Sequence, residues 1–87
     1  MEFHIVKEVM PLEEYKLYVI FFSGEQRIYD IEPLFEKWED FNALKYTRGL
    51  YELVKVDAKG YCVSWNDELD LACNELYYNS VPVEQEN

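Results

Sequence analysis

Alternation of apolar and polar positions in the first third of the chain predicts three β-strands. Residues 1–9 alternate as a half-buried strand does, and residues 15–22 form an aromatic and β-branched run that is apolar on both faces. Residues 11–14 are a polar break between these two segments. After a turn at residues 23–25, which offers a glycine for a positive φ, residues 26–31 return as a third strand. We expect these strands to form an antiparallel meander.

A change in hydrophobic period after Pro33 predicts helices in the middle of the chain. Proline suits the first turn of a helix, because its fixed φ is helical and its missing N–H is not needed there. Apolar positions over residues 34–45 then recur every three or four residues, which predicts one or two short helices. Asp40 is placed to start the second helix, and Gly49 ends the region.

The pattern returns to strands after Gly49. Residues 51–56 and 61–65 alternate again and predict a hairpin. The connection Asp57-Ala58-Lys59-Gly60 fits a type I turn followed by a left-handed glycine, a common way to join two antiparallel strands.

A last helix completes the predicted fold. Asp70 is placed as the N-cap of this helix, and Leu71 and Leu76 form its apolar side. The predicted class is α+β, a small and mostly antiparallel sheet of about five strands with two or three short helices. We expect a single domain over residues 1–80 and a frayed acidic tail over residues 81–87.

Composition and charge narrow the range of functions. The chain has 87 residues, of which 49% are hydrophobic and 17% aromatic, so a dense core is available and disorder is not expected. The formal net charge of −10 argues against direct binding to nucleic acid or to an anionic membrane, and it favours a basic protein as partner. Neither a signal peptide nor an apolar run of about 20 residues is visible, so we expect a cytoplasmic protein outside the membrane.

The negative charge is concentrated toward the end of the chain. Residues 41–60 carry four basic and two acidic side chains, whereas residues 61–87 carry six acidic side chains and no lysine or arginine. We therefore expect a basic partner to dock on the last hairpin, on the turn Asp67–Asp70 and on the helix that follows.

No group of residues predicts catalysis. His4, the only histidine, has apolar neighbours and no serine or cysteine beside it, which indicates a residue on a strand face with a solvated tip. Cys62 and Cys73 lack a neighbouring base or a second cysteine pair, which indicates reduced and partly buried thiols, with a disulfide between them as the alternative. We expect no enzymatic activity and no cofactor.

The acidic turn could serve a metal ion instead of a protein. Asp67, Glu68 and Asp70 are the most concentrated carboxylates, and Mg²⁺ and Ca²⁺ prefer oxygen ligands. The turn lacks the glycine of an EF-hand loop, however, and a helix start would account for the same three residues. They remain weak candidates for metal ligands.

Aromatic residues supply further candidates for binding a partner. Trp65 ends a strand on the face of Val63 and is expected in the core, whereas Trp38 lies in a polar run and is expected as an exposed anchor. Eight tyrosines exceed what a small core can hold with every hydroxyl satisfied, so some should lie at the surface or at a dimer contact. The expected partner-binding residues are Trp38, Tyr77, Tyr78, Asp67 and Glu68.

Three segments of the chain, taken in order, carry a resemblance to a known family. They are residues 17–30, then Pro33-Leu34 with residues 41–44, and finally residues 63–71 followed by Glu75-Leu76-Tyr77. Together they resemble a bacterial family known as domain of unknown function 2442, over roughly residues 6–78. The tryptophan followed by Asp-Leu in the last segment is the most specific part.

The resemblance implies a small bacterial α+β domain without established catalytic residues. Members of the family often sit beside small genes in what look like toxin–antitoxin operons. The leading hypothesis is thus a protein-interaction module, an antitoxin-like or accessory partner of a neighbouring gene product that could also form a homodimer. The alternatives are a small metal-binding protein or enzyme that uses Asp67–Asp70, and an acidic mimic of nucleic-acid charge.

Overall fold

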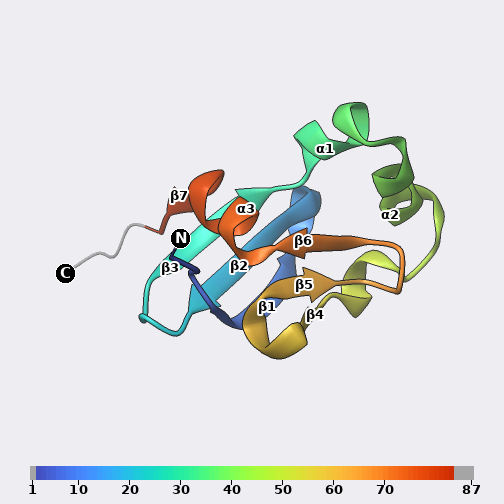
Figure 1. The fold of residues 1–87 in the computed structure, drawn as a ribbon. Coiled ribbons are helices and arrows are strands. Elements are labelled where there is room, and N and C mark those ends of the chain that lie inside the picture. The colour runs from blue at the N-terminus through green and yellow to red at the C-terminus, as the bar shows by residue number, and fades with distance from the viewer. Residues whose placement is uncertain (1, 84–87) are drawn as a thin grey trace.

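Two antiparallel sheets and short helices make up the part of the chain that the structure describes, residues 2–83 (Figure 1). In this computed structural model the strand order is β1-β2-β3-β7 in one sheet and β4-β5-β6 in the other. The elements are β1 (Val6–Leu12), β2 (Lys16–Phe21), β3 (Gln26–Asp30), α1 (Glu32–Lys37), α2 (Ala43–Tyr46), β4 (Lys55–Asp57), β5 (Cys62–Ser64), β6 (Asp70–Ala72), α3 (Cys73–Tyr78) and β7 (Val81–Pro82). Single 3₁₀ turns cover Glu13–Tyr15, Glu39–Asn42, Tyr51–Leu53 and Ala58–Gly60. The α+β class is confirmed, with two sheets in place of one.

The predicted antiparallel meander is confirmed by the pairing of the first three strands, but the bounds of the first strand are wrong, because β1 begins at Val6 and includes Pro11 and Leu12 of the predicted break. β2 lies between β1 and β3, and its central residue Val19 is opposite Val9 on one side and Arg27 on the other. Leu17, Val19 and Phe21 alternate with half-buried residues, so one face of β2 is fully buried. The meander therefore forms because alternation in sequence becomes one apolar face in the sheet.

The hydrophobic core draws on both sheets and on the helical segment between them. Trp65 is 4% exposed and belongs to this core, as predicted, whereas Trp38 remains 41% exposed. The buried hydrophobic residues are Val6, Leu17, Val19, Phe21, Tyr29, Ile31, Leu34, Phe41, Leu44, Leu50, Val63, Trp65, Leu69, Leu71, Cys73 and Leu76. Among the described residues no helix is long and apolar enough to cross a membrane.

The strand predicted over residues 51–56 is wrong in its first half. Tyr51–Leu53 form a 3₁₀ turn, and β4 begins only at Lys55. The Tyr51 hydroxyl lies 2.8 Å from the carbonyl oxygen of Leu12 and 2.6 Å from that of Lys16. Contacts with the turn between β1 and β2 therefore determine the backbone conformation of residues 51–53. These contacts outweigh the alternating pattern, which favours a strand.

Asp70 is not a helix N-cap, contrary to the prediction. It opens β6 and pairs with Ser64 of β5, while Leu71 pairs with Val63 and is buried. Helix α3 begins three residues later, at Cys73, and no side chain caps it. The pairing with β5 places Leu71 in the core from a strand, so the segment does not need to be helical to bury it.

The turn between β4 and β5 also differs from the predicted type. Ala58, Lys59 and Gly60 all have positive φ values, of 49°, 58° and 95°, instead of a single left-handed glycine. The Asp57 side chain accepts a hydrogen bond from the Ala58 N–H at 2.7 Å, which begins the turn. Gly60 then passes close to β1, because a Cβ atom there would lie 2.4 Å from the Val6 carbonyl oxygen.

The end of the described chain belongs to the first sheet. Val81 and Pro82, which the sequence analysis assigned to the tail, form β7 and pair with Ile28 and Arg27 of β3. The N–H of Val83 donates a hydrogen bond to the Gln26 carbonyl oxygen at 3.0 Å. Residues 84–87 of the predicted tail lie outside the described residues.

Candidate functional site

The candidate partner-binding residues separate into two groups at opposite ends of the molecule. Trp38 follows α1, and Asp67 and Glu68 lie between β5 and β6. Tyr77 and Tyr78 belong to α3, which lies with β7 at the other end (Figure 1). The five residues therefore cannot form a single contact surface.

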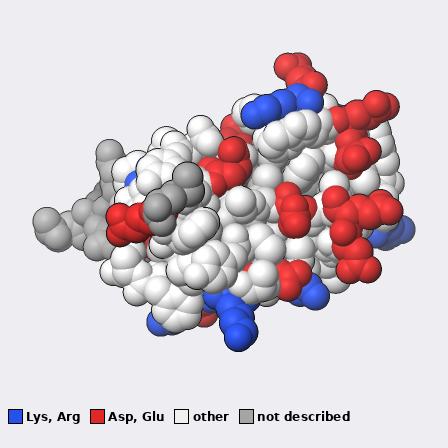
Figure 2. All heavy atoms as spheres, viewed as in Figure 1, with Lys and Arg blue, Asp and Glu red and all other residues white. Residues whose placement is uncertain are grey.

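An acidic hollow with an aromatic wall lies at the end that carries α1 and α2. It encloses about 490 Å³ between residues 37–41 and residues 68–70, and we call it the Trp38 hollow. Figure 2 shows that carboxylates gather at this end of the molecule. The lining residues are Lys37, Trp38, Glu39, Asp40, Phe41, Glu68, Leu69 and Asp70.

The aromatic wall of the Trp38 hollow is anchored in the core. The backbone N–H of Trp38 donates a hydrogen bond to the Leu34 carbonyl oxygen at 2.8 Å and closes α1. The backbone carbonyl of Trp38 accepts a hydrogen bond from the Phe41 N–H at 3.0 Å. The Phe41 ring lies 5.8 Å from the Trp38 ring and 5.9 Å from the Trp65 ring, centroid to centroid. This row of rings holds the Trp38 indole in place at the surface.

The opposite wall is a tight turn that Asn66 organises. Its side-chain oxygen accepts hydrogen bonds from the N–H groups of Glu68 and Leu69, both at 2.9 Å. The backbone N–H of Trp65 donates a hydrogen bond to the Leu69 carbonyl oxygen at 3.0 Å and closes the turn. Leu69 is thereby buried, and Glu68 stands exposed at the rim. Asp67 is exposed in the same turn but does not line the hollow.

The side chain of Lys37 lies over the indole ring of Trp38. The Lys37 Nζ is 4.5 Å from the centroid of the Trp38 ring, a cation–π contact. Within residues 2–83 no group of three or more histidine, cysteine, aspartate or glutamate side chains is arranged to hold a metal ion. Asp70, which the metal hypothesis requires, lies on a strand instead of in one loop with Asp67 and Glu68. The three candidate metal ligands therefore do not share one loop.

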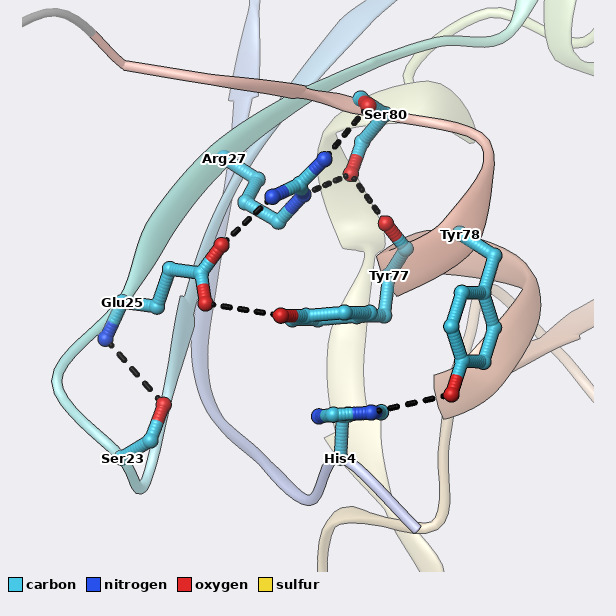
Figure 3. A network of polar contacts seen from close by, with 7 residues as sticks. All are labelled: His4, Ser23, Glu25, Arg27, Tyr77, Tyr78 and Ser80. Atoms are coloured by element: carbon cyan, nitrogen blue, oxygen red, sulfur yellow. Dashed lines mark hydrogen bonds and ion pairs between the residues drawn. The ribbon is translucent and has the colours of Figure 1, made fainter. Parts of the chain in front are cut away.

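At the other end, Tyr77 is the centre of a stacked polar network (Figure 3). Its ring lies between the imidazole of His4 on one face and the guanidinium of Arg27 on the other. The Tyr77 hydroxyl donates to a carboxylate oxygen of Glu25 at 2.9 Å, and Arg27 pairs with the same carboxylate. Arg27 also donates to the Ser80 hydroxyl and carbonyl, at 2.7 and 2.8 Å.

The charges of this network stabilise one another. Hydrogen bonds from Arg27 and then from Tyr77 hold the pKa of Glu25 below its usual value, and the bond to Glu25 raises the pKa of Tyr77. The His4 Nε2 lies 3.2 Å from the Tyr78 hydroxyl. The backbone N–H of His4 donates a hydrogen bond to the side-chain oxygen of Asn74 at 3.0 Å. The network joins the residues before β1 to α3, and among the described residues it brings no serine or cysteine to His4.

Two sequence expectations for reactive residues have different outcomes. His4 precedes β1 and stacks on Tyr77, so the prediction of a strand residue is wrong, while the contact of its Nε2 with the Tyr78 hydroxyl is exposed. Cys62 and Cys73 are free thiols, as predicted, and burial raises the pKa of Cys62. A raised pKa keeps the thiol protonated, which is the opposite of what an activated nucleophile needs.

A second hollow lies where the turn between β1 and β2 meets the end of α2. Its volume is about 580 Å³, and its walls carry charges of both signs, among them Glu13 and Arg48. Glu14 and Tyr15 adopt positive φ there, and Tyr51 contacts the carbonyls on both sides of them. Sequence reasoning did not find this hollow, since neither residue is of a type that favours the left-handed region.

Comparison with known protein families identifies a family for this chain. The model of a family described as "Protein of unknown function (DUF2442)" matches residues 6–82. No curated protein and no solved structure matches the chain.

Proposed function

The chain belongs to the DUF2442 family, whose function is unknown, and we propose that this member is a protein-interaction module for a basic partner. One observation carries the proposal: Trp38 and Glu68, from distant parts of the sequence, line the same hollow together with three further acidic residues. Tryptophan is enriched among the residues that dominate binding energy at protein interfaces. Carboxylates around it complement a positively charged surface and speed its approach.

The family resemblance sets the kind of partner that we propose. The protein would act as the antitoxin-like or accessory partner of a neighbouring gene product. The net charge of −10 supports this role, because it favours association with a basic protein and disfavours self-association through the acidic end.

Co-expression with the product of the adjacent gene tests the proposal. We expect a stable complex in size-exclusion chromatography, or a change in the activity of the neighbour when this chain is added. Trp38→Ala should weaken the complex, whereas Phe22→Ala should not, because Phe22 is a large exposed residue that does not line the Trp38 hollow. A neighbour that neither copurifies nor changes its activity contradicts the proposal.

The gathering of carboxylates at one end also favours a second candidate, a mimic of nucleic-acid charge (Figure 2). Such a mimic would occupy a basic site of another protein and would bind through charge alone. Its complex should weaken steeply with added salt and should be insensitive to Trp38→Ala. An interface anchored by the indole should lose less affinity with salt and more with the substitution.

Homodimer formation remains a separate prediction for the end that carries α3. Tyr78 and Phe3 are more than half exposed there. Sedimentation equilibrium of the wild-type chain and of Tyr78→Ala would test it, and a monomer at all concentrations would refute it.

A further inference from the structure

We propose that the Trp38 hollow binds a lysine or arginine side chain of the partner, whose cation takes the place of the Lys37 ammonium over the indole. The inference rests on the proposed function and names the chemistry that its site recognises. The proposed occupant is therefore a basic protein segment that inserts one cationic side chain.

The indole face is suited to a cation and is within reach of one. Tryptophan is the best of the aromatic side chains for cation–π contacts. Trp38 is 41% exposed, and the row through Phe41 to Trp65 fixes its orientation. The Lys37 Nζ, 4.5 Å from the ring centroid, lies within the distance of a cation–π contact, so the ring face is open to an ammonium group.

The charge of the hollow is unbalanced without a partner. Four acidic residues line it, Glu39 and Asp40 on one wall and Glu68 and Asp70 on the other, against the single basic residue Lys37. The ion pairs found within residues 2–83 join Lys16 to Glu14 and Arg27 to Glu25, so none involves these carboxylates. An incoming guanidinium or ammonium group would gain a cation–π contact with the Trp38 ring. It would also gain charge-assisted hydrogen bonds to the acidic side chains around the hollow.

Lys37 competes with the proposed occupant. It lies at the end of α1, its side chain is exposed, and it can turn to solvent without leaving a buried charge. Removal of this side chain should therefore free the ring face and tighten binding. Removal of a lysine elsewhere changes the net charge equally but leaves the ring occupied.

The two tryptophans allow the site of binding to be read directly. We suggest titration of the full chain with a hexa-arginine peptide, observed through the two indole N–H signals by ¹H–¹⁵N NMR. The Trp38 signal should shift with added peptide. The Trp65 signal should stay, because its indole is buried and donates to the Tyr51 carbonyl at 3.1 Å. A polyglycine-serine peptide of equal length should move neither.

Matched substitutions separate a specific site from general attraction. Glu68→Gln should weaken peptide binding by about fivefold, as the loss of one charge-assisted contact does. Glu13→Gln makes the same charge change at an exposed residue outside the hollow and should stay within about twofold. Lys37→Gln should tighten binding more than Lys59→Gln does. Both glutamates are exposed, and circular dichroism would verify that the variants remain folded.

Specific outcomes overturn the inference. It fails if the Trp38 signal does not move, if Glu13→Gln weakens binding as much as Glu68→Gln, or if Lys37→Gln and Lys59→Gln are equivalent. Co-expression distinguishes this failure from that of the proposed function. A neighbour that still binds the Trp38→Ala variant with full affinity refutes the cation site and leaves the interaction role standing.

Discussion

The imidazole of His4 lies parallel to the ring of Tyr77, with 3.5 Å between the ring centroids and 3° between the ring planes (Figure 3). Arg27 covers the opposite face of Tyr77, with its Cζ 4.8 Å from the centroid. The stack connects the residues before β1 with α3 and with β3, three segments that are far apart in the sequence. The stack therefore holds the residues before β1 against α3.

His4→Ala should lower the free energy of unfolding by about 1 kcal/mol, because it removes an aromatic stack and one hydrogen-bond partner. Urea denaturation followed by circular dichroism measures the change. His4→Phe keeps an aromatic ring beside Tyr77 and should recover a large part of the loss. Equal unfolding midpoints for wild type and His4→Ala would show that the stack contributes nothing.

Gly60→Ala should be more destabilising than Gly24→Ala. Both glycines have φ values near the left-handed region, +95° and +93°, so alanine should cost about 1 kcal/mol at either. At Gly60 the added Cβ would also lie 2.4 Å from the Val6 carbonyl oxygen, whereas nothing lies within 4 Å at Gly24. The clash should add about 1–3 kcal/mol. Thermal unfolding of the two variants compares them, and equal losses would contradict the close approach to β1.

Stability should fall as the pH rises above 10. Burial raises the pKa of Tyr51 from 10.0 to about 12, and burial together with the bond to Glu75 raises the pKa of Tyr29 further. A group whose folded pKa is raised contributes stability below its unfolded pKa, and this stability is lost as the pH rises toward the folded value. Unfolding in urea at pH 8 to 12 should show the fall.

Tyr51→Phe should reduce this alkaline sensitivity, because no phenol remains to ionise at that position. It should also lower stability at neutral pH, since the hydrogen bond to the Leu12 or Lys16 carbonyl is lost. Tyr46→Phe is the control, as Tyr46 is 79% exposed. The same alkaline profile in wild type and Tyr51→Phe would refute the assignment.

Asp57 should contribute to a loss of stability in acid. The hydrogen bond from the Ser64 hydroxyl, and then that from the Ala58 N–H, lower the pKa of Asp57 below its ordinary value of 3.8. A lowered folded pKa gives stability above the unfolded value, and this stability is lost as the pH falls through the folded one. Asp57→Asn should therefore flatten the unfolding profile below about pH 4.

Asp67→Asn serves as the control for this acid effect. It makes the same charge change in an exposed turn, without a hydrogen bond from Ser64. A profile flattened equally by both substitutions would mean that the acid effect comes from net charge alone and not from the turn between β4 and β5.

Local patterning was enough to predict the meander and the presence of helices after Pro33. It failed where a long-range contact outweighs the local pattern. Tyr51 bonds to the carbonyls beside Glu14 and Tyr15, and so residues 51–53 turn instead of extending. Asp70 pairs with Ser64 in a strand, because the sheet offers Leu71 a buried position that a helix would also have given.

The sequence likewise predicted the candidate site only in part. The polar neighbours of Trp38 correctly indicated an exposed ring, and the apolar neighbours of Trp65 a buried one. The distance between Trp38 and Glu68 in the sequence gave no sign that the two line one hollow. The stack of His4 on Tyr77 could not be predicted either, because it depends on the packing of the residues before β1 against α3.

The sequence by itself determined the class of the fold, which of its two tryptophans is buried and which exposed, and the acidic character of its surface. These properties depend on residue type and on periodicity along one segment. Only the tertiary structure decided the division into two sheets, the pairing of β7 with β3, and the presence of Trp38 and four acidic residues around one hollow. Such features depend on which segments pack together, and the energy of that packing is shared between residues that no local pattern relates.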